Sequence, residues 1–541
     1  MTKVANSLGS LLGGLFYSNW RAEPENTTVL VNAFILTLPD DLIVIILAML
    51  DVPTMLTCQR VCRTFSQVIG HSVILQYKIE LTLAGMRDGP SSCHLPVSSR
   101  LLRIRDYALS WRDFAWRERI SFEYRLDAFL DRSFALCGGI MAISRETKTS
   151  LGFLQLPSSL RDIPSRTWEC SYDEPYDNFL LDPEMDLIVL IVQPTPEEPN
   201  LWNFHLRTLG TGEVHPSVAL STITFTAPSS DSREIHAMSM DGNIGVLIDK
   251  QFVVWNWRTG VKQLHWLGDY IQGFVFGPDN YVVVISTKEI TGSALGHPKL
   301  FVFRLSESGL GPGEVNGATF LLPPLAASAR LCDPSLDIGL APERPCPGAP
   351  FVHSDESPML GFSFSVRMPG DKTDKFVHFI PFETLRSHCE RQARRAEDNI
   401  VRWAAWGLPD TYLASNMDVI FSSINGTRFA RPYTVFRDGR WWGLINDFHP
   451  LRVRTAIADE RHDRLILGAS LSHPESQSKT NFFKDRNVMR KTRLPLYMRL
   501  IGLPRDIPAG SKVFLTISQD TLVILEFQVP QLLLRIHLLS L

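Results

Sequence analysis

Two cysteines four residues apart are the first side chains whose spacing is compatible with chemistry. Cys58 and Cys62 share a face if their segment is helical, because side chains four apart are neighbours on a helix. A zinc site needs further Cys or His ligands at short spacing, and none follows. Cys332, Cys346 and His353 also lack metal-ligand spacing. We interpret the cysteines as reduced structural thiols and predict neither a metal nor a cofactor.

Motifs for catalysis are also missing from the sequence. It contains no Gly-x-Ser-x-Gly elbow and no His-Glu-x-x-His pair. The Gly-rich stretch at 309–317 lacks the Lys-Ser/Thr of a phosphate-binding loop. The scattered histidines have no ligand spacing: His205, His236, His353, His449 and His462. We predict no catalytic residue, although distant strands of a β domain could still assemble an enzyme site that linear motifs do not reveal.

Composition limits the class of protein. The chain has 541 residues, 45% of them hydrophobic and 21% charged, which is typical of a globular protein larger than one domain. A formal charge of −3 argues against a general nucleic-acid binder, which needs a basic surplus, and gives no reason to expect an anionic membrane surface as partner. Eight cysteines are too few for a disulfide framework. These observations favour a protein of the cytoplasm or nucleus.

An apolar run at residues 42–50 is the most informative stretch of the sequence. It covers about nine residues, whereas a bilayer-spanning helix needs about 20, so we exclude a membrane segment. Pro39, Asp40 and Asp41 precede the run and favour a helix start. Pro53 interrupts the pattern, and we expect a second helix to begin near Thr54.

The first of these helices is apolar all round. Such a helix must be buried on every side, yet a local unit of about 45 residues is too small to enclose it. The remaining apolar surface must therefore contact another part of the chain or another protein, and the position near the N-terminus favours another protein. The two faces expected from the helical period are Leu42, Ile46 and Met49, and Ile43, Leu47 and Leu50, with Ile45 between them.

From about residue 130 the sequence pattern becomes typical of short strands separated by turns. Turns at Thr211-Gly212, Thr259-Gly260 and Ser308-Gly309 lie about 48 residues apart, near the length of one four-stranded propeller blade. We predict a large all-β domain, a WD-type propeller of about seven or eight blades, after a small all-α region. We expect a flexible tail over 1–34, a helical unit over 35–82 and linker helices over 83–129, with a helix in at least the first half of 101–124. The β domain should cover 130–541, with a loop inserted near 321–350 and a segment with a helical centre inserted near 383–407.

Ten positions of the helical unit resemble the F-box family. The chain follows the F-box pattern in this order: Leu-Pro, acid-Leu, Ile-Leu, Leu, Leu, Val-Cys-Arg and an aromatic residue. It departs from the pattern at two positions, with Asp41 where Glu is more usual and Phe65 where many members carry Trp. Residues 72–89 and the Trp-Arg pairs at 111–112 and 116–117 resemble F-box proteins common in mushroom-forming fungi, in which a propeller-like domain follows. The family's docking positions fall here on Leu38, Pro39, Leu42, Ile46, Leu47, Leu50, Leu56, Val61, Cys62 and Phe65.

The resemblance implies a function. F-box proteins dock on the Skp adaptor of a cullin–RING ubiquitin ligase, and their second domain binds a protein substrate, so this chain would be a non-catalytic substrate receptor. The ten positions divide between internal packing and adaptor contact in a way the sequence does not resolve. Two alternatives stay open: a scaffold that acts outside ubiquitination, and a propeller enzyme with a helical cap.

Four tryptophans of the β domain are candidate interface residues. Trp is a typical hot-spot residue of protein interfaces, but it also packs between propeller blades. We therefore assign no substrate-binding residue among Trp257, Trp266, Trp441 and Trp442.

Overall fold

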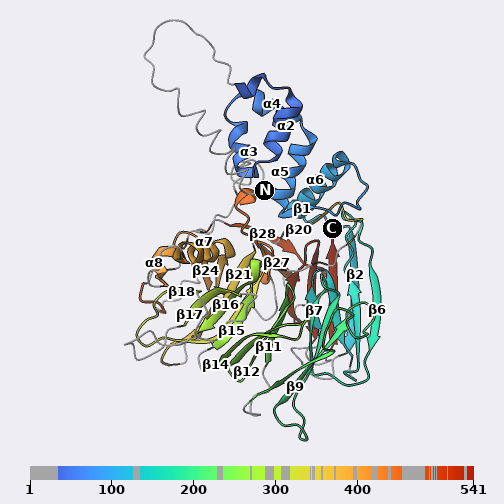
Figure 1. Ribbon diagram of the computed structural model, residues 1–541, viewed down its shortest axis with the longest axis vertical. Helices are drawn as coiled ribbons and strands as arrows, with labels where there is room; N and C mark the ends of the chain where they lie inside the picture. The colour runs from blue at the N-terminus through green and yellow to red at the C-terminus, as the bar shows by residue number, and fades with distance from the viewer. Residues whose placement is uncertain are drawn as a thin grey trace.

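The computed structural model combines a helical unit with a ring of β-sheets (Figure 1). Residues 1–33 of the predicted tail lie outside the described residues. The structure describes residues 34–541 except for 126–133, 146, 228–234, 268–270, 287–297, 306–316, 341–342, 344–345, 347, 355–357, 371–372, 394–398, 416–423, 436–439, 454–481, 486–487, 489–491, 493, 495, 509 and 529–532.

The helical unit begins with a 3₁₀ turn and four short helices. Breaks between them fall at polar caps, and α5 ends at Gly85, whose φ of 69° is a left-handed conformation that glycine adopts without strain. The bounds are η1 (Phe34–Thr37), α2 (Asp40–Ala48), α3 (Val52–Gln59), α4 (Arg63–His71) and α5 (Val73–Ala84).

One long helix connects this unit to the β domain. Helix α6 (Val97–Asp113) follows the short strand β1 (Met86–Asp88). The helix expected in at least the first half of 101–124 is present, and it ends at Asp113 because Phe114 adopts a left-handed conformation. Residues Glu118–Arg125 form strand β2, so the linker helices do not extend to 129 and the β domain begins before residue 130.

Seven antiparallel sheets form a β-propeller, which confirms the predicted architecture. Blades 1 to 3 each contain four consecutive strands: β3 (Phe134–Cys137), β4 (Ile140–Ser144), β5 (Ser150–Gln155) and β6 (Arg166–Ser171); β7 (Asn178–Asp182), β8 (Leu187–Val192), β9 (Leu201–Thr208) and β10 (Thr222–Thr226); β11 (Ile235–Met240), β12 (Asn243–Ile248), β13 (Gln251–Asn256) and β14 (Lys262–Leu267). The turns at Thr211-Gly212 and Thr259-Gly260 join the third and fourth strands of blades 2 and 3, whereas Ser308-Gly309 lies outside the described residues.

The remaining blades carry insertions. Blade 4 contains β15 (Ile271–Phe276), β16 (Tyr281–Ser286), β17 (Lys299–Arg304) and β18 (Gly317–Leu321), with the 3₁₀ turn η2 (Pro278–Asn280) and a parallel fifth strand, β23 (Ile400–Val401). Blade 5 contains β19 (Arg330–Ile338), β21 (Met359–Arg367), β22 (Thr373–Pro381) and β24 (Tyr412–Ser415); blade 6 contains β25 (Ile424–Asn425), β26 (Arg428–Val435), β27 (Arg440–Asp447) and β28 (Tyr497–Gly502).

The two predicted insertions have different outcomes. The Pro-rich segment 321–350 is not a continuous loop, because β19 lies inside it and is the first strand of blade 5. The connection from β19 to the next strand of the blade, β21, contains the short strand β20 (Phe351–His353), which pairs with β1. The segment 383–407 is helical in its first half, as α7 (Phe382–Ala393), and ends in α8 (Trp403–Trp406).

Blade 7 closes the ring with strands from both ends of the β domain. Its strands β29 (Lys512–Ile517), β30 (Thr521–Gln528) and β31 (Leu533–Ser540) are followed by β2, which pairs with β31 from Glu118↔Ser540 to Arg125↔Leu533. A polar chain crosses these strands: Ser121 Oγ lies 2.9 Å from His537 Nδ1, and His537 Nε2 lies 3.0 Å from Glu526 Oε2. The C-terminal strand β31 therefore lies between β30 and β2 within blade 7.

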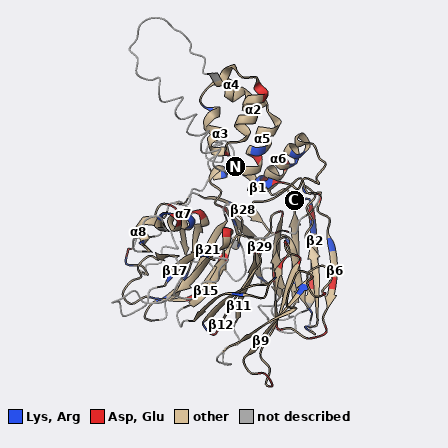
Figure 2. Ribbon diagram, in the orientation of Figure 1, with Lys and Arg blue, Asp and Glu red and all other residues tan. Residues whose placement is uncertain are grey.

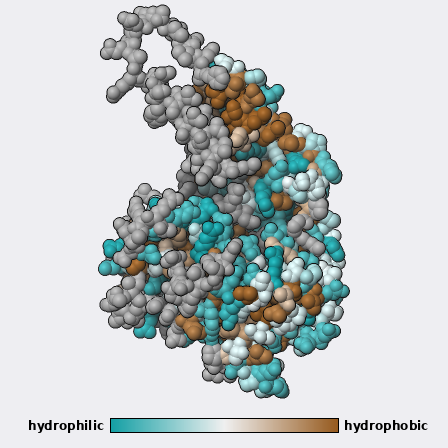
Figure 3. Space-filling view, in the orientation of Figure 1, coloured by the Kyte–Doolittle hydropathy of each residue, from teal (hydrophilic) through white to brown (hydrophobic). Residues whose placement is uncertain are grey.

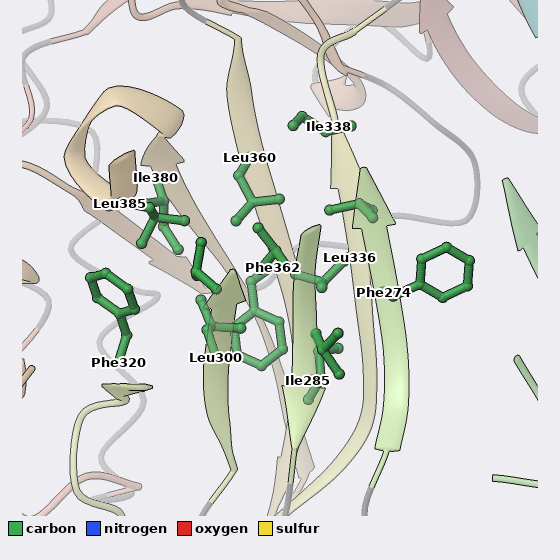
Figure 4. Close-up of a cluster of buried hydrophobic side chains, with 14 of the residues drawn as sticks. Phe274, Ile285, Leu300, Phe320, Leu336, Ile338, Leu360, Phe362, Ile380 and Leu385 are labelled. Carbon is green, nitrogen blue, oxygen red and sulfur yellow. The ribbon is translucent and has the colours of Figure 1, made fainter. Parts of the chain in front are cut away.

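Buried side chains fill the spaces between the blades. The largest cluster joins blades 3, 4 and 5 and includes Phe274, Ile285, Leu300 and Phe362, each at most 1% exposed. In Figure 4 the side chains of Ile285, Leu300 and Phe362 lie near one another between neighbouring strands, whereas Phe274 points to the other side, and its ring centroid lies 4.4 Å from that of Phe252 in blade 3. Neighbouring blades cover both faces of each sheet, so a strand can be apolar at nearly every position. Strand β16, which is buried along its whole length, is an example.

A second cluster joins the helical unit to the propeller. Residues of α5 and α6, among them Tyr77, Ile104 and Tyr107, belong to the same buried cluster as strands of blades 6 and 7. The Tyr107 hydroxyl and the Trp111 indole N–H both donate to the Gln519 carbonyl, at 2.7 and 3.0 Å. The helical unit is therefore packed directly on one end of the propeller (Figure 1).

The closure by β2 generates a prediction about chain boundaries. A chain that starts at 126 loses the half-buried side chains of Ile120, Phe122 and Tyr124, which pack on blade 7 and its neighbour. We expect it to be less stable than a chain that starts at 114 by about 2–4 kcal/mol, because each large apolar side chain contributes about 1.5–3 kcal/mol when fully buried and these three are half-buried. Urea unfolding of both chains measures the difference. Equal midpoints would show that β2 does not stabilise the ring.

Candidate partner-binding site

Polar caps fix the bends between the helices of the helical unit. The Asp51 carboxylate accepts a hydrogen bond of 2.7 Å from the Thr54 amide, so Asp51 caps α3 and the helix begins at Val52, not at Thr54 as the sequence predicts. Cys62 precedes α4, and its sulfur lies 3.5 Å from the Phe65 amide. Burial raises the pKa of the Cys58 thiol, which keeps it protonated, in agreement with a structural role.

Helix α2 has one buried side and one exposed side although both are apolar. Ile43 is 1% exposed and Leu47 2% exposed, and both pack against α4 and α5. Leu42, Ile45 and Met49 are exposed by 46%, 58% and 56%. The surface predicted to need a partner therefore exists, and it comes from one side of a single helix.

The ten predicted docking positions occupy different environments. Leu47 and Phe65 are buried in the core of the helical unit, so their role within the chain is packing. Pro39, Leu42 and Val61 are exposed. The others are half-buried: Leu38, Ile46, Leu50, Leu56 and Cys62. Adaptor contact by the exposed and half-buried positions stays a prediction.

We define the apolar patch as Leu42, Ile45, Met49, Val61, Val73 and Ile74, the large hydrophobic side chains of η1–α5 that are at least 40% exposed. Figure 3 shows a concentration of hydrophobic surface on the helical unit. Charged residues of both signs are scattered over the whole ribbon in Figure 2. Six exposed large apolar side chains on one small domain are typical of an interaction site.

Val73 and Ile74 are the members that sequence reasoning missed entirely. They lie in the first turn of α5, within the apolar run Val73–Leu75, where only Leu75 is buried. The sequence distinguishes exposed Val73 and Ile74 from buried Leu75 only if the first residue of α5 is known, because that residue fixes which side of the helix each one occupies. Ser72 is the sequence signal for the start of α5, because serine is a typical N-cap residue and its hydroxyl accepts a hydrogen bond from the Leu75 amide.

Contacts from other parts of the chain hold the patch in place. The Lys78 ammonium on α5 donates to the carbonyls of Ala48 and Leu50 at 2.8 and 2.7 Å, and so caps the C-terminal end of α2. Leu451, which follows β27 of blade 6, packs against the core of the helical unit. The patch is thus supported from α5 and from the propeller.

The tryptophans considered as interface residues are mainly packing residues. Trp257 is fully buried, and its ring lies edge-on to His215 with centroids 4.9 Å apart. Trp266, Trp441 and Trp442 are half-buried, and the Trp441 indole N–H donates to the Pro508 carbonyl at 3.1 Å. None of them joins the apolar patch.

The part of the chain that the structure describes offers little for other kinds of site. Within it, no group of three or more His, Cys, Asp or Glu side chains has the arrangement to hold a metal ion. His378 is buried, lies 2.8 Å from the Thr411 hydroxyl and has its pKa lowered to about 3 by burial, so it stays neutral. His462 lies outside the described residues. None of the described helices is long and apolar enough to cross a bilayer.

Two isoleucines of α2 test the division between core and patch. Ile43→Ala should destabilise the helical unit by about 2–5 kcal/mol, because it leaves a cavity in a buried core. Ile45→Ala removes the same atoms two residues away at an exposed position and should change stability by no more than about 0.5 kcal/mol. Hydrogen exchange of the α2–α5 amides measures both effects. Similar losses of protection in the two variants would contradict the assignment of the faces.

Comparisons with known proteins agree with this geometry. Residues 35–79 match the F-box-like family, which covers α2–α4 and most of α5. No curated protein matches the chain. A solved structure titled "Crystal structure of the eukaryotic initiation factor" aligns with 61% of this chain and 82% of its own, at 9% identity and a TM-score of 0.27, a likeness that carries no argument. The chain therefore carries an F-box-like domain at residues 35–79, followed by a seven-bladed β-propeller.

Proposed function

We propose that this protein is a substrate receptor of a Skp–cullin–RING ubiquitin ligase. In this proposal the apolar patch of the F-box-like domain binds the Skp-type adaptor, and the propeller binds a protein substrate. The observation that carries it is the patch itself: six large apolar side chains are exposed on the domain whose family generally binds Skp-type adaptors. Insertion of exposed helical side chains into a partner groove is a common recognition mode.

The energetics of the patch fit a partner interface. Each large apolar side chain that becomes fully buried contributes about 1.5–3 kcal/mol, and each 1.4 kcal/mol changes affinity about tenfold. Leu42, Ile45 and the C-cap residue Met49 lie within two turns along α2, so the backbone that carries them is already ordered when they are buried together. These three residues are the expected centre of the adaptor contact.

We assign no catalytic step to the chain. The propeller's role in this proposal is binding, with substrate contacts on its loops, and ubiquitin transfer belongs to other subunits of the ligase. The packing of α5 and α6 on blades 6 and 7 supports these separate roles. It would keep a substrate bound to the propeller at a fixed position relative to the adaptor.

Charge substitutions on the patch test adaptor binding. Leu42→Asp and Ile45→Asp should each weaken binding to a purified Skp-type adaptor at least about tenfold, because a carboxylate would have to be buried in an apolar contact. Leu102→Asp on α6 is the matched control: Leu102 is 68% exposed, lies outside the apolar patch, and its change should leave affinity unaltered. Calorimetric titration measures all three. Wild-type affinity of both patch variants would refute the proposed docking face.

Recruitment of the cullin separates a ligase receptor from a scaffold. Pull-down of the full chain should recover the cullin together with the adaptor, and the Ile45→Asp variant should lose both while it retains any protein bound to the propeller. A partner that binds this variant and accumulates in cells that express it is the expected substrate. Adaptor recovery without cullin would favour the scaffold function instead.

A further inference from the structure

A cavity lies at the junction of the helical unit and the propeller. Its volume is about 120 Å³, room for several water molecules or one small ion. The end of α5 and β1 form one wall, and turns of blades 5, 6 and 7 form the others. The lining side chains used below are Tyr107, Asn425, Thr427, Arg428, His449 and Arg452.

The charged groups on the cavity wall are all cationic. Among its described lining residues, Arg428 and Arg452 carry charge and none is acidic. Both arginines share one carboxylate behind the wall: Arg452 Nε lies 2.8 Å and Arg428 Nε 3.5 Å from Asp447 Oδ2. The other nearby carboxylates, Asp520 and Glu343, are both paired with Arg161. The wall thus presents two guanidinium groups, while Asp447, Asp520 and Glu343, which together balance Arg161, Arg428 and Arg452, lie outside the described lining.

Protein contacts hold both guanidinium groups in place. Arg428 lies over the Trp111 ring, 4.4 Å from its centroid, and its Nη1 donates to the Tyr107 hydroxyl at 3.3 Å. Arg452 Nη2 donates to the Thr427 hydroxyl at 2.8 Å, and its Nη1 donates to the Ala84 carbonyl at 3.3 Å. Groups fixed in this way are preorganised for a ligand, because little side-chain entropy is left to lose.

Titration of the neighbouring groups agrees with a positive, desolvated environment. Burial and the adjacent Arg428 lower the pKa of Arg452 to about 10, against the opposing effect of Asp447. Burial, together with the charge of Arg452, lowers the pKa of His449 to about 3. Burial alone would raise the pKa of Asp447, but the charges of Arg452 and Arg428 hold it below its usual range. Tyr107 and Asp447 outweigh the effect of burial on Arg428 and raise its pKa, so Arg452 is the arginine whose charge an anion in the cavity would stabilise most.

We propose that this cavity binds a small tetrahedral oxyanion of phosphate size. Arginine is the side chain best suited to such oxygens, and Asn425 and Thr427 place further polar groups on the wall. The site is independent of the adaptor-binding patch. Its walls come from α5 and β1 on one side and from three blades on the other, so the bound anion stabilises the junction between the F-box-like domain and the propeller.

Inorganic phosphate and the full-length chain provide the test. Phosphate should raise the unfolding temperature above that in chloride at equal ionic strength, with a saturable dependence that yields a dissociation constant. Sulfate should act similarly and acetate more weakly. O-phosphoserine distinguishes a free ion from a phosphoryl group attached to a residue: binding equal to that of phosphate supports an attached group, and weaker binding supports the free ion. No saturable effect of phosphate or sulfate, or tighter binding of acetate, would overturn the proposal.

Two variants locate the effect in the cavity. Asn425→Asp places a fixed carboxylate beside the arginines; it should keep or raise the unfolding temperature in chloride and weaken phosphate binding at least about tenfold. Arg428→Gln should also weaken binding at least about tenfold and provides a second test if the first variant folds poorly. The matched control is Arg103→Gln on α6, where Arg103 pairs with Asp162 outside the cavity and phosphate affinity should be unchanged. Undiminished binding in a folded Asn425→Asp or Arg428→Gln variant would indicate an adventitious ion only and refute the site.

Discussion

The pairing of β2 with β31 is the interaction on which the rest of the structure depends. It runs along all eight residues of β2 and completes the fourth strand of blade 7. Without this pairing the backbone groups on the outer edge of β31 would have no partner strand, whereas β2 pairs with them and becomes the outer strand of the blade. Because β2 follows α6 after only four residues, the same pairing also brings the helical unit to the propeller. Ring closure and domain placement are therefore one event.

The junction is a continuation of the propeller core. Tyr107 and Trp111 use a carbonyl exposed by the turn between β29 and β30, and Tyr77 donates to the Pro350 carbonyl at 2.8 Å, next to β20. Strand β1 adds a backbone pairing with β20 on the same side. A flexible linker would allow the two domains to reorient, but these buried hydrogen bonds and the shared apolar cluster oppose such motion.

The sequence allowed the architecture to be predicted more fully than the site. Alternation and regular turn spacing are local properties of the chain, so a propeller of about seven or eight blades could be expected from turns such as Thr259-Gly260. Helix α2 has no polar residue between Leu42 and Leu50, so periodicity could not distinguish buried Ile43 from exposed Ile45. That difference depends on where α4 and α5 pack. The cavity at Arg428 and Arg452 could not be predicted either, because its walls come from residues over 400 positions apart.

Closure by β2 has a consequence for the order in which the protein folds. Ser121 and His537 are in contact although 416 positions separate them, so the ring can close only after nearly the whole chain has been synthesised. The F-box-like domain, in contrast, is built from contacts within about 50 residues and can form early. During synthesis β2 must remain unpaired while blades 1 to 6 assemble. The aromatic and charged residues of β2 are thus exposed for most of translation, which makes this short strand the segment where chaperone binding or misassembly would be concentrated.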